Sequence, residues 1–414
     1  MRNWAGNVEF GAARVVAPTS VAELQEVVAS SGLVRAVGTG HSFSRVADTS
    51  GTLVSTLELD LPLEALGDDR LVVVPGGATY ARLTAALHEE GWALHNLGSL
   101  PHISVAGACS TGTHGSGNTN GSLSTAVAAV ELVRADGELV RFSDADPQFP
   151  GAVLALGCLG VVTRLWLRTE PAYEVSQVVH TGVPSGPLLE RLDEVLAMAY
   201  SVSVFSTFSD RSRVDGVWLK RRVAPGDGPA PSLLGVPPDT VPRHPVQGMD
   251  PAATTAQLGE RGPWHHRLPH FRPEFTPSAG EELQSEYYLG REHAAEAFEA
   301  LSAVGDEIAP VLLVFEMRTV AADDLWLSPS HGRDTVTMHF TWVHDFEAVR
   351  PVLEVVEAVL ERFDPRPHWG KVFLSRDAGW VAESYPELGR FQVLRNEMDP
   401  DRHFGNPFSS RLLG

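Results

Sequence analysis

Two glycine-rich runs in the first third of the chain limit how it can fold. Gly38-Thr-Gly-His-Ser-Phe43 directly follows Leu33–Val37, which is typical of a β-strand, and Gly107–Gly117 has no bulky apolar side chain. Glycine lets a backbone approach a ligand closely, and consecutive N–H groups in such turns form anion-binding concavities. The first run has neither the spacing of a dinucleotide-binding fingerprint nor a Walker lysine. We expect Gly107–Gly117 to be a loop laid against a pyrophosphate rather than a flexible linker.

Short strands and helices alternate over residues 1 to about 170. Leu71–Val74 and Ala128–Arg134 have β-type composition, whereas Ser20–Ser30 and Tyr80–Glu89 show the apolar periodicity of helices. This pattern predicts an α/β or α+β unit rather than a helical bundle. A second part opens near Glu170-Pro171, as expected for a chain of 414 residues, since single cores stop growing near roughly 250–300 residues.

Two predicted strands of the second part each carry one apolar and one polar face. Alternation along Leu312–Thr319 places Leu313, Phe315 and Met317 on one face and Val314, Glu316 and Arg318 on the other. Along Thr335–Trp342 the apolar face is Val336, Met338, Phe340 and Trp342, and the polar face is Thr335, Thr337, His339 and Thr341. The polar faces either meet water or line one cavity suited to a hydroxyl-rich ligand.

A proline-rich segment, residues 225–277, holds 12 of the 29 prolines. A long irregular connection is unusual in a compact domain unless it is functional or mobile. The segment either wraps the second domain and covers a site or is a surface excursion without a role. His265, His266 and His270 lie in it, but no carboxylate or cysteine spacing makes them a metal site, and no metal is expected.

Charge and composition exclude several classes of function. The formal charge of −20 opposes binding to nucleic acid or anionic membranes, so neither partner is expected. Cys109 and Cys158, the two cysteines, cannot form a disulfide framework. The longest apolar stretch, Val153–Val162, is far shorter than the roughly 20 residues of a membrane span, and no apolar signal region follows Arg2. A soluble, cytoplasmic protein is expected.

Motifs along the whole chain resemble the vanillyl-alcohol-oxidase-type FAD enzymes, and most closely the alditol oxidases, also called xylitol or sorbitol oxidases. The motifs that carry this resemblance are Asn3–Asn7, Gly38–Phe43, Ser99–Gly107, Thr111–Gly117, Trp218–Arg222, Glu282–Tyr287, Glu316–Ala322, Trp326–Pro329, His339–Val343, Pro367–Phe373 and Asn406–Phe408. The resemblance implies an α+β fold with a PCMH-type FAD-binding domain (residues 1–170, completed by the tail 376–414). A substrate (cap) domain, residues 171–375, is expected to contain a large antiparallel sheet flanked by helices.

The resemblance also implies how the cofactor is held. His41 matches the histidine that these oxidases join covalently to the 8α-methyl group of FAD, and Ser99 matches a serine beside the flavin N5. The other matched FAD positions are Ala36, Val37, Gly38, Thr39, Gly40, Ser42, Ser104, Gly107, Thr111, Gly112, Thr113, His114 and Val162.

The matched polyol pocket consists of Ser99, Gln284, Glu316, Arg318, His339, Thr341 and Lys371. The implied reaction oxidises the terminal primary alcohol of an alditol (xylitol or sorbitol, with glycerol as a further candidate) to the aldose and reduces O₂ to H₂O₂. His339 is the expected base, with Lys371 and Arg318 stabilising the developing alkoxide, although the sequence alone does not decide whether His339 or Lys371 takes the proton. An aldonolactone oxidase or dehydrogenase is the alternative. The protein is expected to be a monomer.

Gly98 lies where some members of the family carry alanine. Without a Cβ, it leaves more room beside the flavin and would ease the access of O₂. The alternative is that Gly98 occupies a turn that requires a positive φ.

Overall fold

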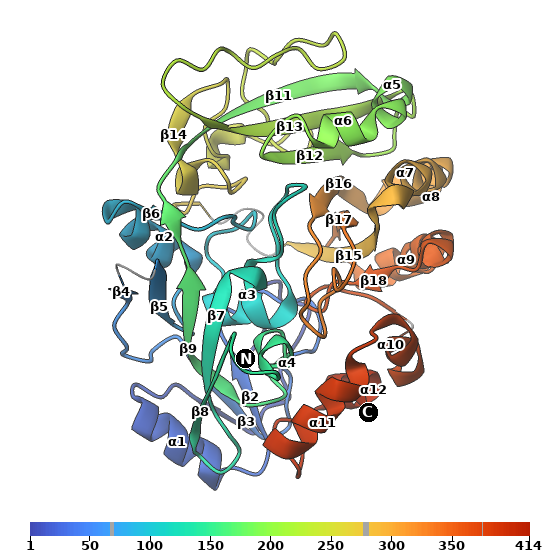
Figure 1. Cartoon of the computed structure of the whole chain (residues 1–414). Coiled ribbons are helices and arrows are strands. Elements are labelled where there is room, and N and C mark those ends of the chain that lie inside the picture. Colours follow the sequence, from blue (N-terminus) through green and yellow to red (C-terminus); the bar gives the residue numbers. More distant parts are fainter. Residues whose placement is uncertain (67–69, 276–280, 375) are drawn as a thin grey trace.

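The computed structural model describes residues 1–66, 70–275, 281–374 and 376–414 (Figure 1). Its first part contains two sheets. The parallel sheet has the order β1-β3-β2, and the antiparallel sheet has the order β4-β5-β9-β7-β8. The strands are β1 (Arg14–Val16), β2 (Val34–Val37), β3 (Thr52–Ser55), β4 (Glu64–Leu66), β5 (Leu71–Pro75), β7 (Val127–Val133), β8 (Leu139–Ser143) and β9 (Val161–Arg168).

Four helices and one strand pair accompany these sheets: α1 (Val21–Ser30), α2 (Tyr80–Glu89), α3 (Val105–Thr111), α4 (Phe149–Val153) and the pair β6 (Trp92–Ala93) with β10 (Glu170–Pro171). The predicted helices at Ser20–Ser30 and Tyr80–Glu89 are confirmed. The Ser20 and Thr79 side chains cap their first turns by accepting hydrogen bonds from backbone N–H groups, which explains where they begin.

The second part is built on an eight-stranded antiparallel sheet with the order β14-β11-β13-β12-β16-β17-β15-β18. Its strands are β11 (Glu174–Pro184), β12 (Ser201–Ser206), β13 (Arg213–Val223), β14 (Arg261–Pro263), β15 (Glu282–Gly290), β16 (Leu312–Val320), β17 (Thr335–Val343) and β18 (Arg366–Pro367). The helices α5 (Ser185–Glu190), α6 (Leu192–Leu196), α7 (Ala294–Ala303), α8 (Gly305–Ile308) and α9 (Phe346–Leu360) cover one face of this sheet (Figure 1). The expected α+β class, with a large antiparallel sheet flanked by helices, is therefore confirmed.

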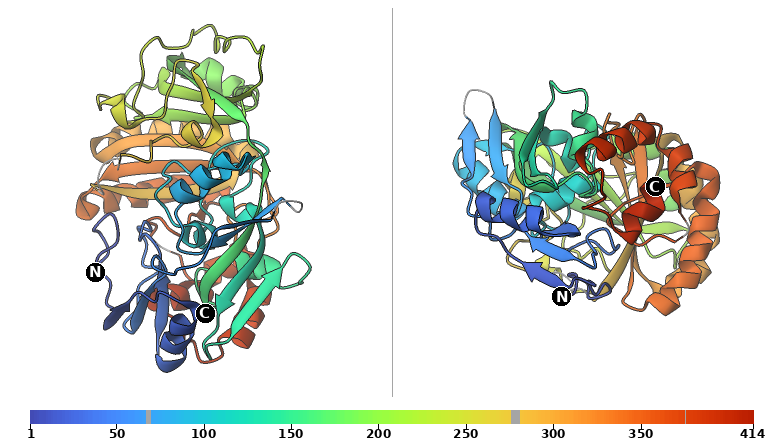
Figure 2. Two further views of the ribbon diagram at one scale, coloured as in Figure 1. Left: turned by 90° about the vertical axis from the view of Figure 1, so that its left-hand side faces the viewer. Right: turned by 90° about the horizontal axis from the view of Figure 1, so that it is seen from below.

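The face of the large sheet that meets these helices is apolar. Phe315, Met317 and Phe340 belong to one buried cluster with Phe298 of α7 and Leu353 of α9. The opposite face looks toward the first part of the chain (Figures 1 and 2). The prediction that the apolar side chains of Thr335–Trp342 share one core-facing side of the strand is thus confirmed.

The chain ends in three helices, α10 (Ala378–Ser384), α11 (Leu388–Met398) and α12 (Pro407–Leu413). Phe391 and Leu412 share a buried cluster with Val153 and Leu154 at the end of α4, so the last helices pack against the first part of the chain. Short 3₁₀ helices occur at Leu123–Ala126, Pro251–Ala253, Trp264–His266, Arg291–His293, Ala309–Val311 and Glu361–Phe363.

The buried guanidinium of Arg35 on β2 ties distant segments of the first part together. Its Nη1 donates to the Phe404 carbonyl at 2.8 Å and to the Gly157 carbonyl at 3.1 Å. Its Nη2 donates to the carbonyls of Leu156, at 2.6 Å, and Val46. A buried carbonyl without a donor costs about 1–3 kcal/mol, so one side chain stabilises three loops at once.

Two local predictions are wrong. The expected loop Gly107–Gly117 is helical up to Thr111, because Val105, Ala108 and Cys109 pack into the core and override the low helix propensity of the run. The loop starts only after Gly112, whose φ of 78° ends the helix.

Leu313 also differs from its predicted face. The pairing of β16 with β17 shifts between Leu312 and Val314, so Leu313 is an extra, bulged residue. Leu312 packs into the apolar core in its place, and Leu313 faces the same cavity as Val314.

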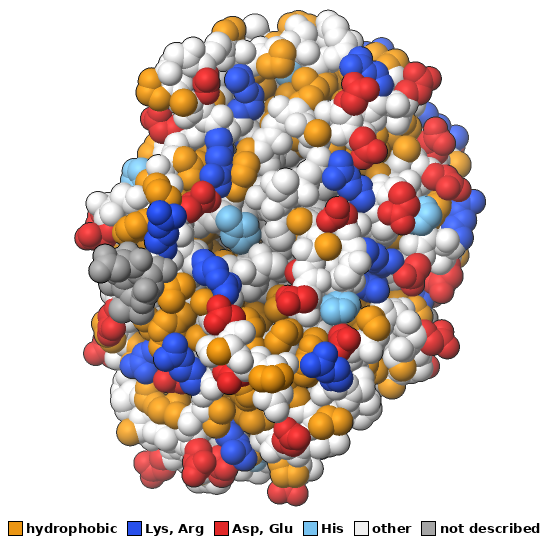
Figure 3. Space-filling view, in the orientation of Figure 1, with side chains coloured by type: hydrophobic (Ala, Val, Ile, Leu, Met, Phe, Trp, Pro, Cys, Tyr) orange, Lys and Arg blue, Asp and Glu red, His pale blue; other side chains and the backbone are white. Residues whose placement is uncertain are grey.

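No helix among the described residues is long and apolar enough to cross a membrane. On the face shown in Figure 3, acidic and basic side chains are interspersed and form no extended basic patch.

Candidate active site

A large cavity separates the first part of the chain from the polar face of the eight-stranded sheet. Its walls come from the segments 35–47, 99–114 and 156–162 of the first part and from β15, β16, β17 and the loop 368–371 of the second. Glu316 and Arg318 of β16 and His339 and Thr341 of β17 all line it. The prediction that both polar faces line one cavity is confirmed for these four residues. Thr335 and Thr337, by contrast, are fully buried and do not line the cavity; Thr335 bonds to Ser330.

Small residues and hydroxyl groups form the wall contributed by the first part. A Cβ at Gly38 would lie 2.0 Å from Ser104 Oγ, so only glycine allows this close approach of β2 to the start of α3. Thr39 Oγ1 accepts from the Ser104 N–H at 3.1 Å and joins the first glycine-rich run to the start of α3. Backbone N–H groups and hydroxyls, rather than lysines, are therefore the donors available to a phosphate-bearing ligand.

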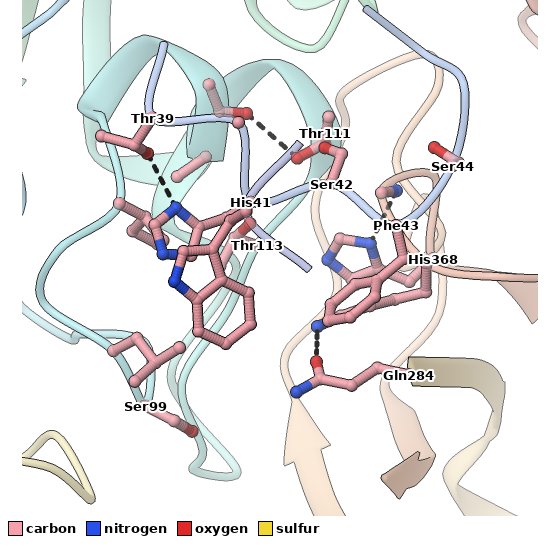
Figure 4. Close-up of a pocket in the computed structure, with 18 of the residues that line it drawn as sticks. Thr39, His41, Ser42, Phe43, Ser44, Ser99, Thr111, Thr113, Gln284 and His368 are labelled. Carbon is pink, nitrogen blue, oxygen red and sulfur yellow. Dashed lines mark hydrogen bonds between the residues drawn. The ribbon is translucent and has the colours of Figure 1, made fainter. Parts of the chain in front are cut away.

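His41 is held in a fixed position at this wall. Its Nδ1 lies 3.0 Å from Thr39 Oγ1, as Figure 4 shows, and Trp4 stacks on its ring with centroids 4.9 Å apart. Burial lowers the pKa of His41 to about 4, with smaller contributions from His102 and Lys371. The imidazole is consequently neutral at physiological pH.

The N-terminal segment fastens the turn that carries His41. The Trp4 N–H donates to the Gly40 carbonyl at 2.8 Å, Asn3 Nδ2 donates to the Ser42 carbonyl at 2.9 Å, and Asn7 Nδ2 donates to the Phe43 carbonyl at 3.0 Å. These bonds explain why Asn3–Asn7 and Gly38–Phe43 occur together as motifs.

Glu286 of β15 is a fully buried carboxylate that contacts three basic side chains. Its Oε1 lies 3.0 Å from both His114 Nε2 and Arg318 Nη2, and its Oε2 lies 3.3 Å from His339 Nδ1. Burial alone would raise the pKa of Glu286, but His114, His339 and Arg318 together hold it well below its usual range. The carboxylate is therefore ionised, and its Oε2 faces Nδ1 of His339.

Arg318 connects this carboxylate to the rest of the site. Its Nη1 lies 3.4 Å from Ser99 Oγ, and its Nε lies 3.5 Å from Glu316 Oε1. Burial would raise the pKa of Glu316, but Arg318 and His270 outweigh it and keep this pKa far below the usual range. Two carboxylates thus share one guanidinium.

Lys371, in the loop after β18, also lines the cavity. Its Nζ bonds to Gln284 Oε1 and lies 5.1 Å from the centre of the Phe43 ring. Burial lowers the pKa of Lys371 to about 8, and Glu286 partly offsets this effect. Burial also lowers the pKa of His339 despite the contact with Glu286.

The proline-rich segment covers part of the cavity. His244, Pro245, Val246, Met249, His270 and Phe271 contribute to its lining. The Phe271 N–H donates to the Ser99 carbonyl at 3.3 Å and so joins the segment to the first part of the chain. Of the two interpretations of this segment, the cover over a site is the one confirmed.

The structure brings together nearly all the residues singled out from the sequence. The cavity is lined by Ala36, Val37, Gly38, Thr39, Gly40, His41, Ser42, Ser99, Ser104, Gly107, Thr111, Thr113, His114, Val162, Gln284, Glu316, Arg318, His339, Thr341 and Lys371. Gly112 is the exception: its carbonyl accepts from the Tyr288 hydroxyl at 3.1 Å, away from the lining. No cluster of three or more potential metal ligands occurs in the described ranges.

Sequence reasoning missed two buried residues of the site. Glu286 continues the alternation of Glu282 and Gln284 along β15, so the same face analysis applied to this strand would have found it. His368, whose Nδ1 accepts from the Gly370 N–H at 3.0 Å, lies in a loop without periodicity and left no such signal.

Gly98 does not require a positive φ, so that alternative is wrong. A Cβ built on Gly98 would make ordinary contacts, the closest at 3.5 Å to Thr113 Cγ2. An alanine therefore fits at this position without strain.

Comparisons with known proteins agree with this geometry. Residues 12–143 match the family described as "FAD binding domain", and residues 281–412 match the family "D-arabinono-1,4-lactone oxidase". An alditol oxidase of Streptomyces sp. is 50% identical over 99% of this chain and 98% of its own length. An L-gulono-1,4-lactone dehydrogenase of Mycobacterium tuberculosis is 30% identical over 100% and 98%, respectively.

A solved structure shares the fold at much lower identity. Cholesterol oxidase from B. sterolicum covers 100% of this chain and 96% of its own with a TM-score of 0.75 and 13% identity. Hydroxyl- and glycine-rich walls around a neutral His41, facing a polar sheet, fit FAD on one side and a hydroxylic substrate on the other. Together with the match along its full length, these features show that the chain belongs to the alditol oxidase family of vanillyl-alcohol-oxidase-type FAD oxidoreductases.

Proposed function

We propose that this protein is an FAD-dependent alditol oxidase, which converts the terminal primary alcohol of alditols such as xylitol and sorbitol, and of glycerol as a further candidate, to the aldose and reduces O₂ to H₂O₂. The observation that carries the proposal is the convergence of polar side chains from β15, β16, β17 and two loops on one cavity that also contains His41. The 50% identity to an alditol oxidase over nearly the full chain supports it.

When bound, FAD accepts a hydride from the substrate carbon and passes two electrons to O₂. In the proposal, Ser99 and the glycine- and hydroxyl-rich wall from Ala36 to Val162 hold this cofactor, and His41 is its covalent attachment point. A neutral imidazole has an unprotonated nitrogen, which is the form that attacks an electrophilic carbon. The depressed pKa of His41 and the stacking of Trp4 support this role.

His339 is proposed to take the proton of the reacting hydroxyl. In the proposal, Nδ1 carries the ring proton because it faces Glu286 Oε2 at 3.3 Å. Nε2, which contacts Thr341 Oγ1 at 3.3 Å, is then the nitrogen that can accept the substrate proton. Lys371 and Arg318 supply positive charge to a developing alkoxide in the same cavity. Lys371, with a pKa lowered by burial only to about 8, stays mostly protonated at neutral pH, which favours His339 as the base.

In the proposal, the site binds several hydroxyl groups of the substrate at once. Glu316, Gln284, Ser99 and Thr341 offer acceptors and donors in one cavity. A ligand lacking a hydroxyl leaves one of these groups unpaired, at about 1–3 kcal/mol each. Such a site favours polyols over simple alcohols.

The proposal includes the organisation of the chain. Residues 1–170 with the tail 376–414 form the FAD-binding domain, and residues 171–375 form the substrate domain. The enzyme is proposed to be a cytoplasmic monomer, and the free, buried Cys109 and Cys158 are in keeping with a reducing compartment.

An aldonolactone oxidase is the competing function, because residues 281–412 match a lactone oxidase family. Visible spectra of the purified protein under anaerobic conditions, before and after addition of xylitol, separate the two. Bleaching of the flavin band, with recovery and peroxide formation in air, is expected with xylitol. Bleaching by L-gulono-1,4-lactone alone would overturn the alditol assignment.

The covalent attachment predicts that acid-precipitated wild-type protein stays yellow. His41→Ala should release its flavin into the supernatant, because no other attachment point is proposed. Absorbance of pellet and supernatant measures this directly. His102→Ala, a nearby histidine without this role, is the control and should retain the flavin. Retention by the His41 variant would disprove the linkage.

His339→Ala should slow anaerobic flavin reduction by xylitol at least about 100-fold, the usual lower bound for loss of a general base. Thr341→Ala, the matched control on the same strand, should mainly raise the KM for xylitol, by about tenfold, since one hydrogen bond is lost. Stopped-flow absorbance separates the two effects. Rapid reduction in His339→Ala would refute its role as base.

The pH dependence of kcat/KM for xylitol should have two limbs. His339 must be unprotonated, and because burial lowers its pKa, activity is lost only as the pH falls through that lowered pKa, below 6.5. Lys371 must be protonated, so activity falls as the pH rises through about 8. Lys371→Met should lower the plateau and abolish the alkaline limb. An unchanged alkaline limb in that variant would contradict the assignment.

Gly98→Ala should slow the reaction of the reduced flavin with O₂ and leave its reduction by xylitol unchanged, because the added methyl group narrows the space beside Thr113. Gly32→Ala, at an exposed glycine with open space around it, is the control. Stopped-flow mixing with oxygenated buffer measures the rate. Equal oxygen rates in the two variants would exclude a role for Gly98.

A further inference from the structure

Lys220 of β13 is a buried amine with an unusual set of partners. It is 1% exposed and does not line the cavity. Its Nζ bonds to the Leu268 carbonyl, to the Pro269 carbonyl at 3.1 Å, and to His270 Nδ1 at 3.2 Å. No ion pair of Lys220 occurs among the described residues. An ammonium group buried without a carboxylate is costly, so its position needs a reason.

His270 links Lys220 to Glu316, which lines the cavity. Its Nε2 lies 2.8 Å from Glu316 Oε1. Because Lys220 can only donate when it is charged, His270 Nδ1 accepts, and the ring proton is left on Nε2 to donate to Glu316. The edges of Phe205 and Trp218, with centroids 5.6 and 5.2 Å away, hold the imidazole in place.

The result is a carboxylate with one oxygen engaged and one available. Glu316 Oε1 faces His270 and, at 3.5 Å, Arg318 Nε. Within the described ranges, no protein hydrogen bond involves Oε2, while Glu316 lines the cavity. The same contacts fix residues 268–271, at the end of the proline-rich segment, where Thr255 Oγ1 also donates to the Pro269 carbonyl at 2.7 Å.

We propose that Lys220 and His270 act as a positioning pair that orients Glu316 for a substrate hydroxyl and anchors the proline-rich segment over the cavity, so that Lys220 sets the affinity for the polyol without touching it. This inference rests on the proposed function, since it takes Glu316 as a substrate ligand. Burial lowers the pKa of Lys220 to about 7, whereas the negative charge of Glu316 raises it. The three hydrogen bonds of Nζ offset part of the cost of burying this amine.

The test uses the flavin-loaded enzyme and xylitol. Lys220→Met keeps the length of the side chain and removes its donors, and it should raise the KM about tenfold with kcat nearly unchanged. His270→Phe should behave alike, whereas His270→Gln, which can still accept from Lys220 and donate to Glu316, should restore much of the affinity. Arg221→Met is the matched control, because Arg221 adjoins Lys220 and bonds to the Gly228 carbonyl of the same segment without reaching Glu316.

Coupling to Glu316 separates positioning from general stabilisation. In a Glu316→Gln background, Lys220→Met should add little to the KM. Either of two results would overturn the proposal: Lys220→Met leaves the KM unchanged, or the double variant raises the KM by the product of the two single-variant factors. If wild type is not reduced by xylitol at all, it is the proposed function that fails.

A measurement independent of substrate tests the anchoring. Tryptic cleavage after the exposed Arg243, within the proline-rich segment, should be faster in Lys220→Met and His270→Phe than in wild type or Arg221→Met. Equal cleavage rates in all four proteins would refute the anchoring. If Lys220→Met fails to fold, as judged by its flavin absorbance, His270→Phe carries both tests.

Discussion

The ionised, fully buried carboxylate of Glu286 is the contact on which the site depends. It reaches across the boundary between the two parts of the chain to His114, and within the large sheet it meets Arg318 and His339. Removing one partner of a buried charge network leaves an uncompensated charge, which typically costs about 3–5 kcal/mol. The network therefore fixes how the sheet sits over the first part, and it places a negative charge beside Nδ1 of His339.

In the first part of the chain, the corresponding contacts are hydrogen bonds to backbone carbonyls. The Arg35 guanidinium donates hydrogen bonds to four backbone carbonyls in three segments. The asparagines of the N-terminal segment donate to backbone carbonyls of the turn around His41 and hold it in place. Arg35 itself lines the cavity, but both of its terminal nitrogens are engaged by its four carbonyl partners. A wall made of backbone dipoles, hydroxyls and glycines can meet a phosphate-bearing cofactor closely, whereas lysines would need room for long side chains.

Periodicity and capping made much of this fold predictable, and the failures have local causes. The strand around His339 and the helix after Ser20 follow from alternation and from a capping side chain. The stretch Gly107–Thr111 was misjudged because core packing of Val105 and Cys109 outweighs propensity, and Leu313 because a bulge resets the alternation. Lys220 and His270 lie far apart in the sequence, and no local pattern could have linked them to Glu316.

The charges around the substrate end of the cavity indicate what kind of ligand it accepts. The lining on that side contains three carboxylates, Glu282, Glu286 and Glu316, and two cations, Arg318 and Lys371. The charges nearly cancel, and the net charge is slightly negative. An anionic substrate would be repelled by the carboxylates, and Arg318 is already engaged by Glu286 and Glu316. Each hydroxyl of a neutral polyol can donate a hydrogen bond to a carboxylate or accept one from a cation. A ligand with fewer hydroxyls leaves some of these buried groups unpaired, which lowers its affinity. Selectivity for polyols is thus a consequence of balanced, immobilised charges rather than of shape alone.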